Sequence, residues 1–177
     1  MKTVAQMAQE LADREAIRDC LFRYCRGIDR LDIDLLRDVY WPGAIDEHAG
    51  FVGTGDEFIA HAAQALSPLE QTMHNLGNIL IEVAGETAWS EAYFHAFHRI
   101  PGDQGPWDLI VGGRYVDRME KRDDVWRIAH RVVMIDWLRS YPDSADWSNL
   151  PLGMTVKPGD HSTADRSYDL RGAALGG

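Results

Sequence analysis

The chain has 177 residues, a length that fits one domain with a modest tail. Hydrophobic residues make up 45% of the chain, so we expect a well-formed core rather than a disordered protein. With 28 acidic against 18 basic residues, the formal net charge is −10. This charge argues against nucleic acid or an anionic membrane as partner, because both need clustered positive charge.

The first third of the chain predicts three helices. Residues 7–30 carry apolar side chains at spacings of three and four, which indicates one long amphipathic helix. Residues 32–40 predict a short second helix that stops at Pro42 and Gly43. Residues 44–53 predict a short strand or hairpin. We expect Asp56 to cap a third helix over residues 57–66, which ends before Pro68.

Two cysteines, Cys20 and Cys25, lie on the first predicted helix. A separation of five residues turns them about 140° apart, so a disulfide between them is not expected. This cysteine usage favours a reducing compartment, and we expect a cytoplasmic protein. The N-terminal segment has no apolar signal core, and no run approaches the roughly 18 apolar residues that a membrane span needs.

The middle of the chain predicts four long strands, because apolar and polar residues alternate between turn-forming breaks. These strands cover residues 71–83, 87–100, 107–121 and 124–138. Three helices followed by antiparallel strands indicate an α+β fold, with the helices on the concave side of a strongly curved sheet. We expect residues 1–140 to form the domain. Residues 141–177 read as a loop-rich tail that covers the pocket, docks on a neighbouring subunit or is mobile, with local order near residues 166–168.

Two residues are candidates for proton transfer. Asp29 lies in the last turn of the first helix, about 40° from Cys25, and therefore borders the buried stripe. His74 opens the first long strand, and histidine is the natural side chain for proton transfer near neutral pH. From spacing alone, both residues are also explained structurally, Asp29 as an exposed helix-terminal acid and His74 as a hydrogen-bonded strand residue.

The strand faces suggest where a cavity wall would lie. In residues 87–100 one face is mostly small, and the other carries the larger Trp89, Tyr93 and Phe97, which suits a subunit contact. Gly112 and Gly113 indicate a bulge or a close backbone approach. Alternation places Arg131 on one face with Val133, Ile135 and Trp137, where it either reaches solvent or meets a carboxylate or ligand. The substrate-binding residues expected on these faces are Phe94, His98, Val111, Tyr115, Val133 and Trp137.

Sequence motifs for metal, nucleotide or nucleophile chemistry are absent. The chain contains no HExxH, HxH or cysteine cluster, and no GxSxG, P-loop or GxGxxG. We therefore expect neither a metal nor another cofactor.

Four segments together carry a family resemblance. They are YCRGIDRLDIDLLRDVYW, TMHNLGN, WSEAYFHAFHR and RYVDRMEKRDDVWRIAHR, within residues 8–139. The chain resembles the SnoaL-like, scytalone-dehydratase-like branch of the nuclear-transport-factor-2-like superfamily. Relatives in that branch include hexachlorocyclohexane dehydrochlorinase and bile-acid 7α-dehydratase. The resemblance implies a cone-shaped barrel of curved antiparallel sheet, closed by helices around an internal pocket.

The resemblance also implies roles for particular residues. Asp29 and His74 match the catalytic Asp–His dyad of the dehydratases and the dehydrochlorinase. Tyr24 matches a tyrosine near the pocket of the bile-acid enzyme, and Arg131 an active-site arginine of the dehydrochlorinase. Scytalone dehydratase has a tyrosine where this chain has Ile28, and the bile-acid enzyme's arginine is replaced near Ile135. Neither named substrate therefore transfers to this chain.

Together, the residues and the resemblance predict a cofactor-free β-elimination. We expect a dehydratase acting on a small hydrophobic cyclic, polyketide-like or steroid-like substrate, in which Asp29 fixes the tautomer of His74 and His74 takes a proton from carbon. Tyr24 or Arg131 stabilises the leaving group or a developing enolate. The alternatives are a double-bond isomerase, a non-catalytic ligand-binding or assembly module, and a small subunit of a ring-hydroxylating oxygenase. The resemblance favours a homotrimer, with a dimer as the other option.

Overall fold

Six strands form one curved sheet in the computed structural model, which describes residues 2–145, 150–155 and 158–176. The elements, in chain order, are α1 (Val4–Arg30), α2 (Ile33–Val39), β1 (Tyr40–His48), β2 (Phe51–Thr54), α3 (Gly55–Leu66), β3 (Gln71–Ala84), β4 (Thr87–Ile100), β5 (Trp107–Arg122), β6 (Val125–Pro142), the 3₁₀ turn η1 (Pro151–Gly153) and α4 (Arg166–Leu175). The predicted α+β class is confirmed, and the four long strands lie where alternation placed them.

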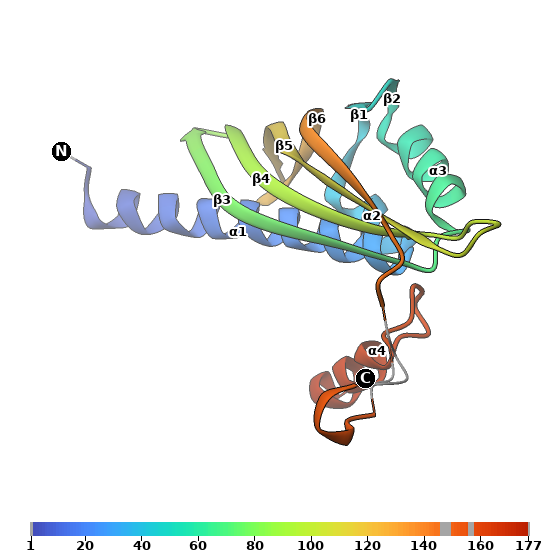
Figure 1. Cartoon of the computed structure of the whole chain (residues 1–177). Helices are drawn as coiled ribbons and strands as arrows, with labels where there is room; N and C mark the ends of the chain where they lie inside the picture. The colour runs from blue at the N-terminus through green and yellow to red at the C-terminus, as the bar shows by residue number, and fades with distance from the viewer. Residues whose placement is uncertain (1, 146–149, 156–157, 177) are drawn as a thin grey trace.

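The sheet has the order β2-β1-β6-β5-β4-β3 and stays open between its edge strands β2 and β3. Neighbouring strands are antiparallel except for β1 and β6, which pair in parallel. Figure 1 shows α1 running along the curved sheet, with its N-terminal turns projecting past the strands, and α3 at the end occupied by β1 and β2. No helix within the described residues is long and apolar enough to cross a membrane.

Helix α1 forms because its ends are capped and one of its faces is apolar. A capping box links Thr3 and Gln6 at its start, and Leu31 takes a left-handed conformation at its end, with φ 48°. The helix is continuous from Val4, three residues earlier than predicted. Its buried stripe includes both cysteines, which are free, as expected. The stripe consists of Ile17, Cys20, Leu21, Tyr24, Cys25 and Ile28.

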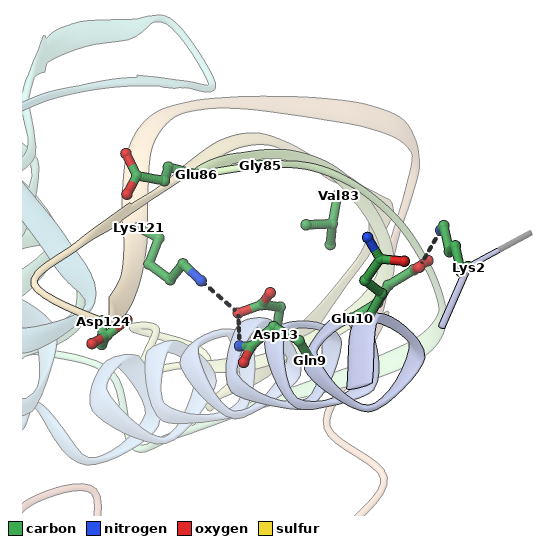
Figure 2. A pocket seen from close by; sticks show the side chains of 10 residues that line it. Lys2, Gln9, Glu10, Asp13, Val83, Gly85, Glu86, Lys121 and Asp124 are labelled. Carbon is green, nitrogen blue, oxygen red and sulfur yellow. Dashed lines mark hydrogen bonds and ion pairs between the residues drawn. The ribbon is translucent and has the colours of Figure 1, made fainter. Parts of the chain in front are cut away.

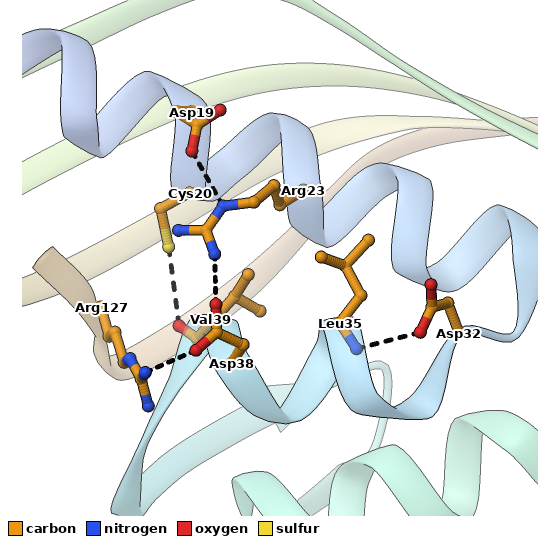
Figure 3. A network of polar contacts seen from close by, with 8 residues as sticks. All are labelled: Asp19, Cys20, Arg23, Asp32, Leu35, Asp38, Val39 and Arg127. Carbon is orange, nitrogen blue, oxygen red and sulfur yellow. Dashed lines mark hydrogen bonds and ion pairs between the residues drawn. The ribbon is translucent and has the colours of Figure 1, made fainter. Parts of the chain in front are cut away.

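Helix α2 folds back tightly onto α1 (Figure 3). The Asp32 carboxylate accepts a hydrogen bond from the Leu35 backbone N–H at 3.0 Å and so caps the short helix. Asp38 near its end receives Arg23 of α1 and Arg127 of β6. A Cβ on Gly27 would lie 2.8 Å from the Leu36 side chain, so only glycine permits this close approach of the two helices.

Helix α3 begins earlier than the sequence suggested. The Thr54 hydroxyl accepts the Glu57 backbone N–H at 3.3 Å, and the Glu57 carboxylate accepts the Thr54 backbone N–H at 2.8 Å. The expectation that Asp56 caps this helix is therefore wrong, because Asp56 already lies inside the first turn. The helix ends at Leu66, before Pro68, as predicted.

A bulge sets which side chains face inward near the end of β6. The pairing of β5 with β6 slips between Gly112 and Gly113, which confirms the predicted irregularity there. Because Gly113 pairs with Ile135 and Gly112 with Trp137, the extra residue reverses the alternation after Ile135. The expectation that Trp137 shares a face with Arg131 is therefore wrong. Trp137 lies over Gly112 on the outer face, with its ring 5.0 Å from that of His95.

The described part of the tail packs against the helices of the same chain. Strand β6 runs to Pro142, two residues beyond the expected domain boundary. Helix α4 begins at Arg166, where local order was expected, and the Tyr168 hydroxyl donates to the Asp32 carboxylate at 2.8 Å. The Arg26 guanidinium lies 4.4 Å from the centre of the Tyr168 ring. These contacts hold α4 against the junction of α1 and α2.

Candidate active site

Asp29 and His74 meet where the end of α1 crosses the start of β3. The His74 Nδ1 atom lies 2.7 Å from Asp29 Oδ1, and the His74 backbone N–H donates to Asp29 Oδ2 at 2.9 Å. The Thr72 hydroxyl donates to Asp29 Oδ1 at 3.0 Å. One carboxylate therefore accepts three hydrogen bonds and fixes both the ring and the backbone of His74.

The electrostatics of this pair favour a charged aspartate. Burial raises the pKa of the Asp29 carboxyl, but the hydrogen bonds and charge of His74 lower it more, so that pKa lies below its ordinary value. An ionised Asp29 can only accept, so the Nδ1 of His74 carries a proton, and in the neutral imidazole the lone pair is then on Nε2. The pair is thus arranged as a general base.

His74 lines a cavity of about 120 Å³ in the described structure. The cavity lies among α1, the end of β1, α3 and the strands β3 and β4. Its lining residues are Tyr24, Ile28, His48, Phe58, His61, Ala62, Ala65, Leu66, His74 and His98. An enclosed volume of about 150 Å³ is known to hold benzene, so the present cavity suits a molecule of about one small ring.

His98 adds a neutral polar group beside the dyad. Its ring meets that of His74 edge to face, with 5.4 Å between the ring centres. Burial, and then the charge of His74, lower the pKa of His98 to about 4, so this ring is neutral at neutral pH. Its Nδ1 atom is buried and has no hydrogen-bond partner within the described residues. A bound polar group would satisfy it.

Arg131 packs against the ring of Tyr24, which lines the cavity. The Arg131 guanidinium is fully buried and makes two hydrogen bonds of 2.7 Å to Asp117, so of the options left open by the sequence it meets a carboxylate. It lies 4.0 Å from the centre of the Tyr24 ring and 4.3 Å from that of Tyr115. Tyr24 lines the cavity, whereas Arg131 is not among the lining residues.

The other five predicted binding residues do not line the cavity. Phe94 and Tyr115 stack with 4.3 Å between ring centres and, with Val133, are buried in the core next to the site. Val111 is partly buried against the same core. None of these four residues, nor Trp137, is among the residues that line the cavity.

Sequence reasoning did not single out several residues at the cavity. Most of them come from α3 and from the end of β1, where His48 and Asp46 share a face in a D-x-H pattern. That pattern was available in the sequence as strand alternation. His161 of the tail does not line the cavity but contacts residues next to it, since its Nδ1 lies 2.8 Å from the Asp29 backbone oxygen and its Nε2 lies 3.3 Å from the Leu66 backbone oxygen.

A larger hollow of about 530 Å³ lies near the N-terminal half of α1 (Figure 2). Asp13 beside it receives Trp126 Nε1 at 2.8 Å, Lys121 Nζ at 3.1 Å and Gln9 Nε2 at 3.2 Å. These contacts tie the helix to β5 and β6. Its described lining includes no histidine. The histidines that could transfer protons therefore line the smaller cavity and not this hollow. No group of three or more His, Cys, Asp or Glu in the described residues is arranged to hold a metal ion.

Comparison with known families and structures gives a consistent result. The family described as the SnoaL-like domain matches residues 9–132. A protein of unknown function from Mycobacterium tuberculosis is 25% identical, with a TM-score of 0.63 over 73% of this chain and 75% of that chain. No curated protein matches the chain.

Two further solved structures share the fold at lower identity. A protein from Novosphingobium aromaticivorans, provisionally described as a scytalone dehydratase, is 22% identical, with a TM-score of 0.68 over 85% of this chain and 99% of its own. A hexachlorocyclohexane dehydrochlorinase from Novosphingobium barchaimii is 18% identical, with a TM-score of 0.67 over 84% of this chain and 97% of its own.

Proposed function

We propose that this protein, which belongs to the SnoaL-like domain family within the nuclear-transport-factor-2-like superfamily, is a cofactor-independent lyase. The proposed reaction removes water from a small cyclic substrate. The observation that carries the proposal is the 2.7 Å contact between His74 and Asp29 at the wall of a small cavity. Two of the structural relatives are described as a dehydratase and a dehydrochlorinase, and both names denote eliminations.

In the proposed reaction, His74 Nε2 takes a proton from a carbon next to a carbonyl group. Asp29 accepts the hydrogen bond from the Nδ1–H of His74 and stabilises the imidazolium that forms. Burial raises the pKa of Tyr24 well above its ordinary value, so its hydroxyl stays protonated and can donate to the developing oxyanion. Neutral His98 offers a second polar contact in the same cavity. Arg131 acts through Tyr24, whose ring covers it.

The cavity volume narrows the expected substrate class. At about 120 Å³ the cavity takes one small ring, whereas drug-sized ligands occupy roughly 300–1,000 Å³. A single-ring β-hydroxy ketone fits this space and places an acidic C–H, a carbonyl and a leaving hydroxyl within one molecule. A steroid-sized substrate would need the cavity to open.

Turnover of 3-hydroxycyclohexanone tests the proposal. We expect the protein to form 2-cyclohexenone, detected by the enone absorbance and by the loss of one water in the product mass, and His74→Gln to abolish it. His95→Gln is the matched control, because His95 lies on the outer face. Binding of the ketone without product that depends on His74 would contradict the proposed reaction.

A double-bond isomerase would use the same base, and product mass separates the two reactions. An isomerase converts 3-cyclohexenone to 2-cyclohexenone with no change in mass and leaves 3-hydroxycyclohexanone untouched. A lyase shows the reverse preference.

We also propose that the protein is a homotrimer in which subunits meet through the outer sheet face.

A further inference from the structure

A second histidine–carboxylate pair lies at the same cavity. His48, the last residue of β1, lines the cavity, and its Nδ1 atom lies 3.5 Å from Asp46 Oδ1. The two residues are two positions apart on one strand, so both project from the same face. Its ring stacks on Phe58 with 4.7 Å between ring centres. This packing fixes the plane of the imidazole.

The Asp46 carboxylate is buried beside the His48 ring. It is fully buried, and its Oδ2 atom accepts the Tyr40 hydroxyl at 2.6 Å. Its Oδ1 atom has no hydrogen-bond partner within the described residues, and neither has the His48 Nδ1 atom that faces it. A buried carboxylate is costly unless a positive or hydrogen-bonding group satisfies it. An N–H on His48 Nδ1 would satisfy this one.

The cavity histidines differ in whether a carboxylate lies close to the imidazole ring. Four of them line the cavity: His48, His61, His74 and His98. Within the described residues, only His48 and His74 among these four have a carboxylate oxygen within 4.0 Å of a ring nitrogen. His61 stacks on Phe51 instead, with 5.0 Å between ring centres. The cavity is therefore lined by two histidines that face a carboxylate and two that do not.

The two pairs reach the cavity from different strands. His74 stands on β3 and His48 on β1, and the strands β6, β5 and β4 separate these two in the sheet. Curvature of the sheet brings both to one cavity of about 120 Å³. A single small ring in this cavity would contact both histidines. With Nδ1 directed at Asp46, the Nε2 atom is the one left for a ligand.

We propose that His48, held by Asp46, is the general acid that protonates the leaving hydroxyl while His74 removes the proton from carbon. This inference rests on the proposed elimination. The C–H bond breaks and its proton passes to His74, while its electrons form the C=C bond. The C–O bond breaks with its electron pair on oxygen, and the proton from His48 Nε2 completes the leaving water. His74 ends one proton richer and His48 one proton poorer, and exchange with solvent restores both.

The test compares two leaving groups on one carbon skeleton. Elimination from 3-hydroxycyclohexanone expels hydroxide, which needs a proton, whereas 3-chlorocyclohexanone expels chloride, which needs none. Both give 2-cyclohexenone. We expect His48→Gln to lower kcat on the hydroxy ketone by about 100-fold or more and to change kcat on the chloro ketone by less than about 3-fold. Asp46→Asn should show the same preference more weakly, and His95→Gln, on the outer sheet face, should change neither rate appreciably.

His74→Gln provides the contrast, because loss of the base should lower both rates, after subtraction of the uncatalysed reaction. Equal losses on both substrates in His48→Gln would reveal a packing effect and overturn the acid role, as would no loss on either. If the wild-type protein converts the chloro ketone but His74→Gln converts it equally well, the proposed elimination fails instead.

A binding measurement checks the geometry without turnover. In nitrogen NMR spectra of the histidine side chains, 2-cyclohexenone should shift the Nε2 signals of both His48 and His74. The His95 signal on the outer face should stay unchanged. A shift of His74 with no change at His48 would place the ligand away from Asp46 and overturn the proposal, while leaving the base role of His74 intact.

Discussion

Asp29 holds His74 at two points, because one carboxylate oxygen meets the imidazole Nδ1 at 2.7 Å and the other meets the backbone N–H at 2.9 Å. The second contact is to the main chain of β3. The position of the imidazole is therefore set by the sheet as well as by its own torsion angles. A helix end and a strand start become one rigid unit, which suits a base that must reach a carbon proton.

Replacement of Asp29 by Asn should lower turnover by about 10²–10⁴-fold, because an amide can donate to Nδ1 and favour the wrong tautomer of His74. The fold should persist, since the amide still fills the site and accepts hydrogen bonds. The checks are the rate on 3-hydroxycyclohexanone and the thermal midpoint. Asp34→Asn, at a side chain that is 96% exposed, is the control. Near-normal turnover in Asp29→Asn would rule out the dyad.

The stability of the protein should depend on pH through Asp29. Its pKa is lowered in the folded state, so the folded state binds fewer protons than the unfolded chain around that pKa. The stabilisation is therefore fully present above the ordinary value of about 3.9 and is lost as pH falls through the lowered pKa. Urea unfolding from about pH 5 downward should show a steeper loss of stability in the wild type than in Asp29→Asn. Parallel curves would contradict this.

Arg131 should contribute mainly to stability. Burial lowers its pKa, but Asp117, together with Tyr40 and Tyr24, raises it well above its ordinary value, so the guanidinium stays charged. Arg131→Met should cost about 3–5 kcal/mol, because Asp117 is left as an unpaired buried charge. Arg118→Met, at a side chain that is 56% exposed, should change the free energy of unfolding by less than about 1 kcal/mol.

A double variant separates the ion pair from the packing around it. Arg131→Met combined with Asp117→Leu removes both charges, and we expect it to be more stable than Arg131→Met alone. Chemical unfolding measures each value. A double variant less stable than both single variants would show that shape, rather than charge pairing, governs this site.

Self-association should use the outer sheet face. Trp89 and Tyr93 are 38% and 41% exposed there, and exposed aromatic clusters are typical of interfaces. We expect sedimentation to give a trimer, and Trp89→Glu to shift the population towards monomer. Leu170→Glu on α4 is the control, because that residue is 61% exposed on a different element. A monomeric wild type would refute this assembly.

Local pattern predicted the scaffold well. Spacing of three and four placed Tyr24 and Ile28 on the buried stripe of α1, and alternation placed Phe94 inward and Trp89 outward on β4. These outcomes follow from the helical and strand periods, which any contiguous segment carries by itself. The start of α3 was missed because Thr54 and Asp56 are both good capping residues, and only the backbone path decides between them.

The sequence alone determined the order of the helices and long strands, most of their buried faces and, through family resemblance, the pairing of Asp29 with His74. Tertiary structure decided what surrounds that pair. The extra residue after Ile135 turned Trp137 to the outside, because strand register depends on the partner strand and not on the segment itself. Curvature of the whole sheet brought His48, with Asp46 behind it, to the cavity of His74. Contacts between distant strands depend on how the chain closes, and no local period encodes that closure.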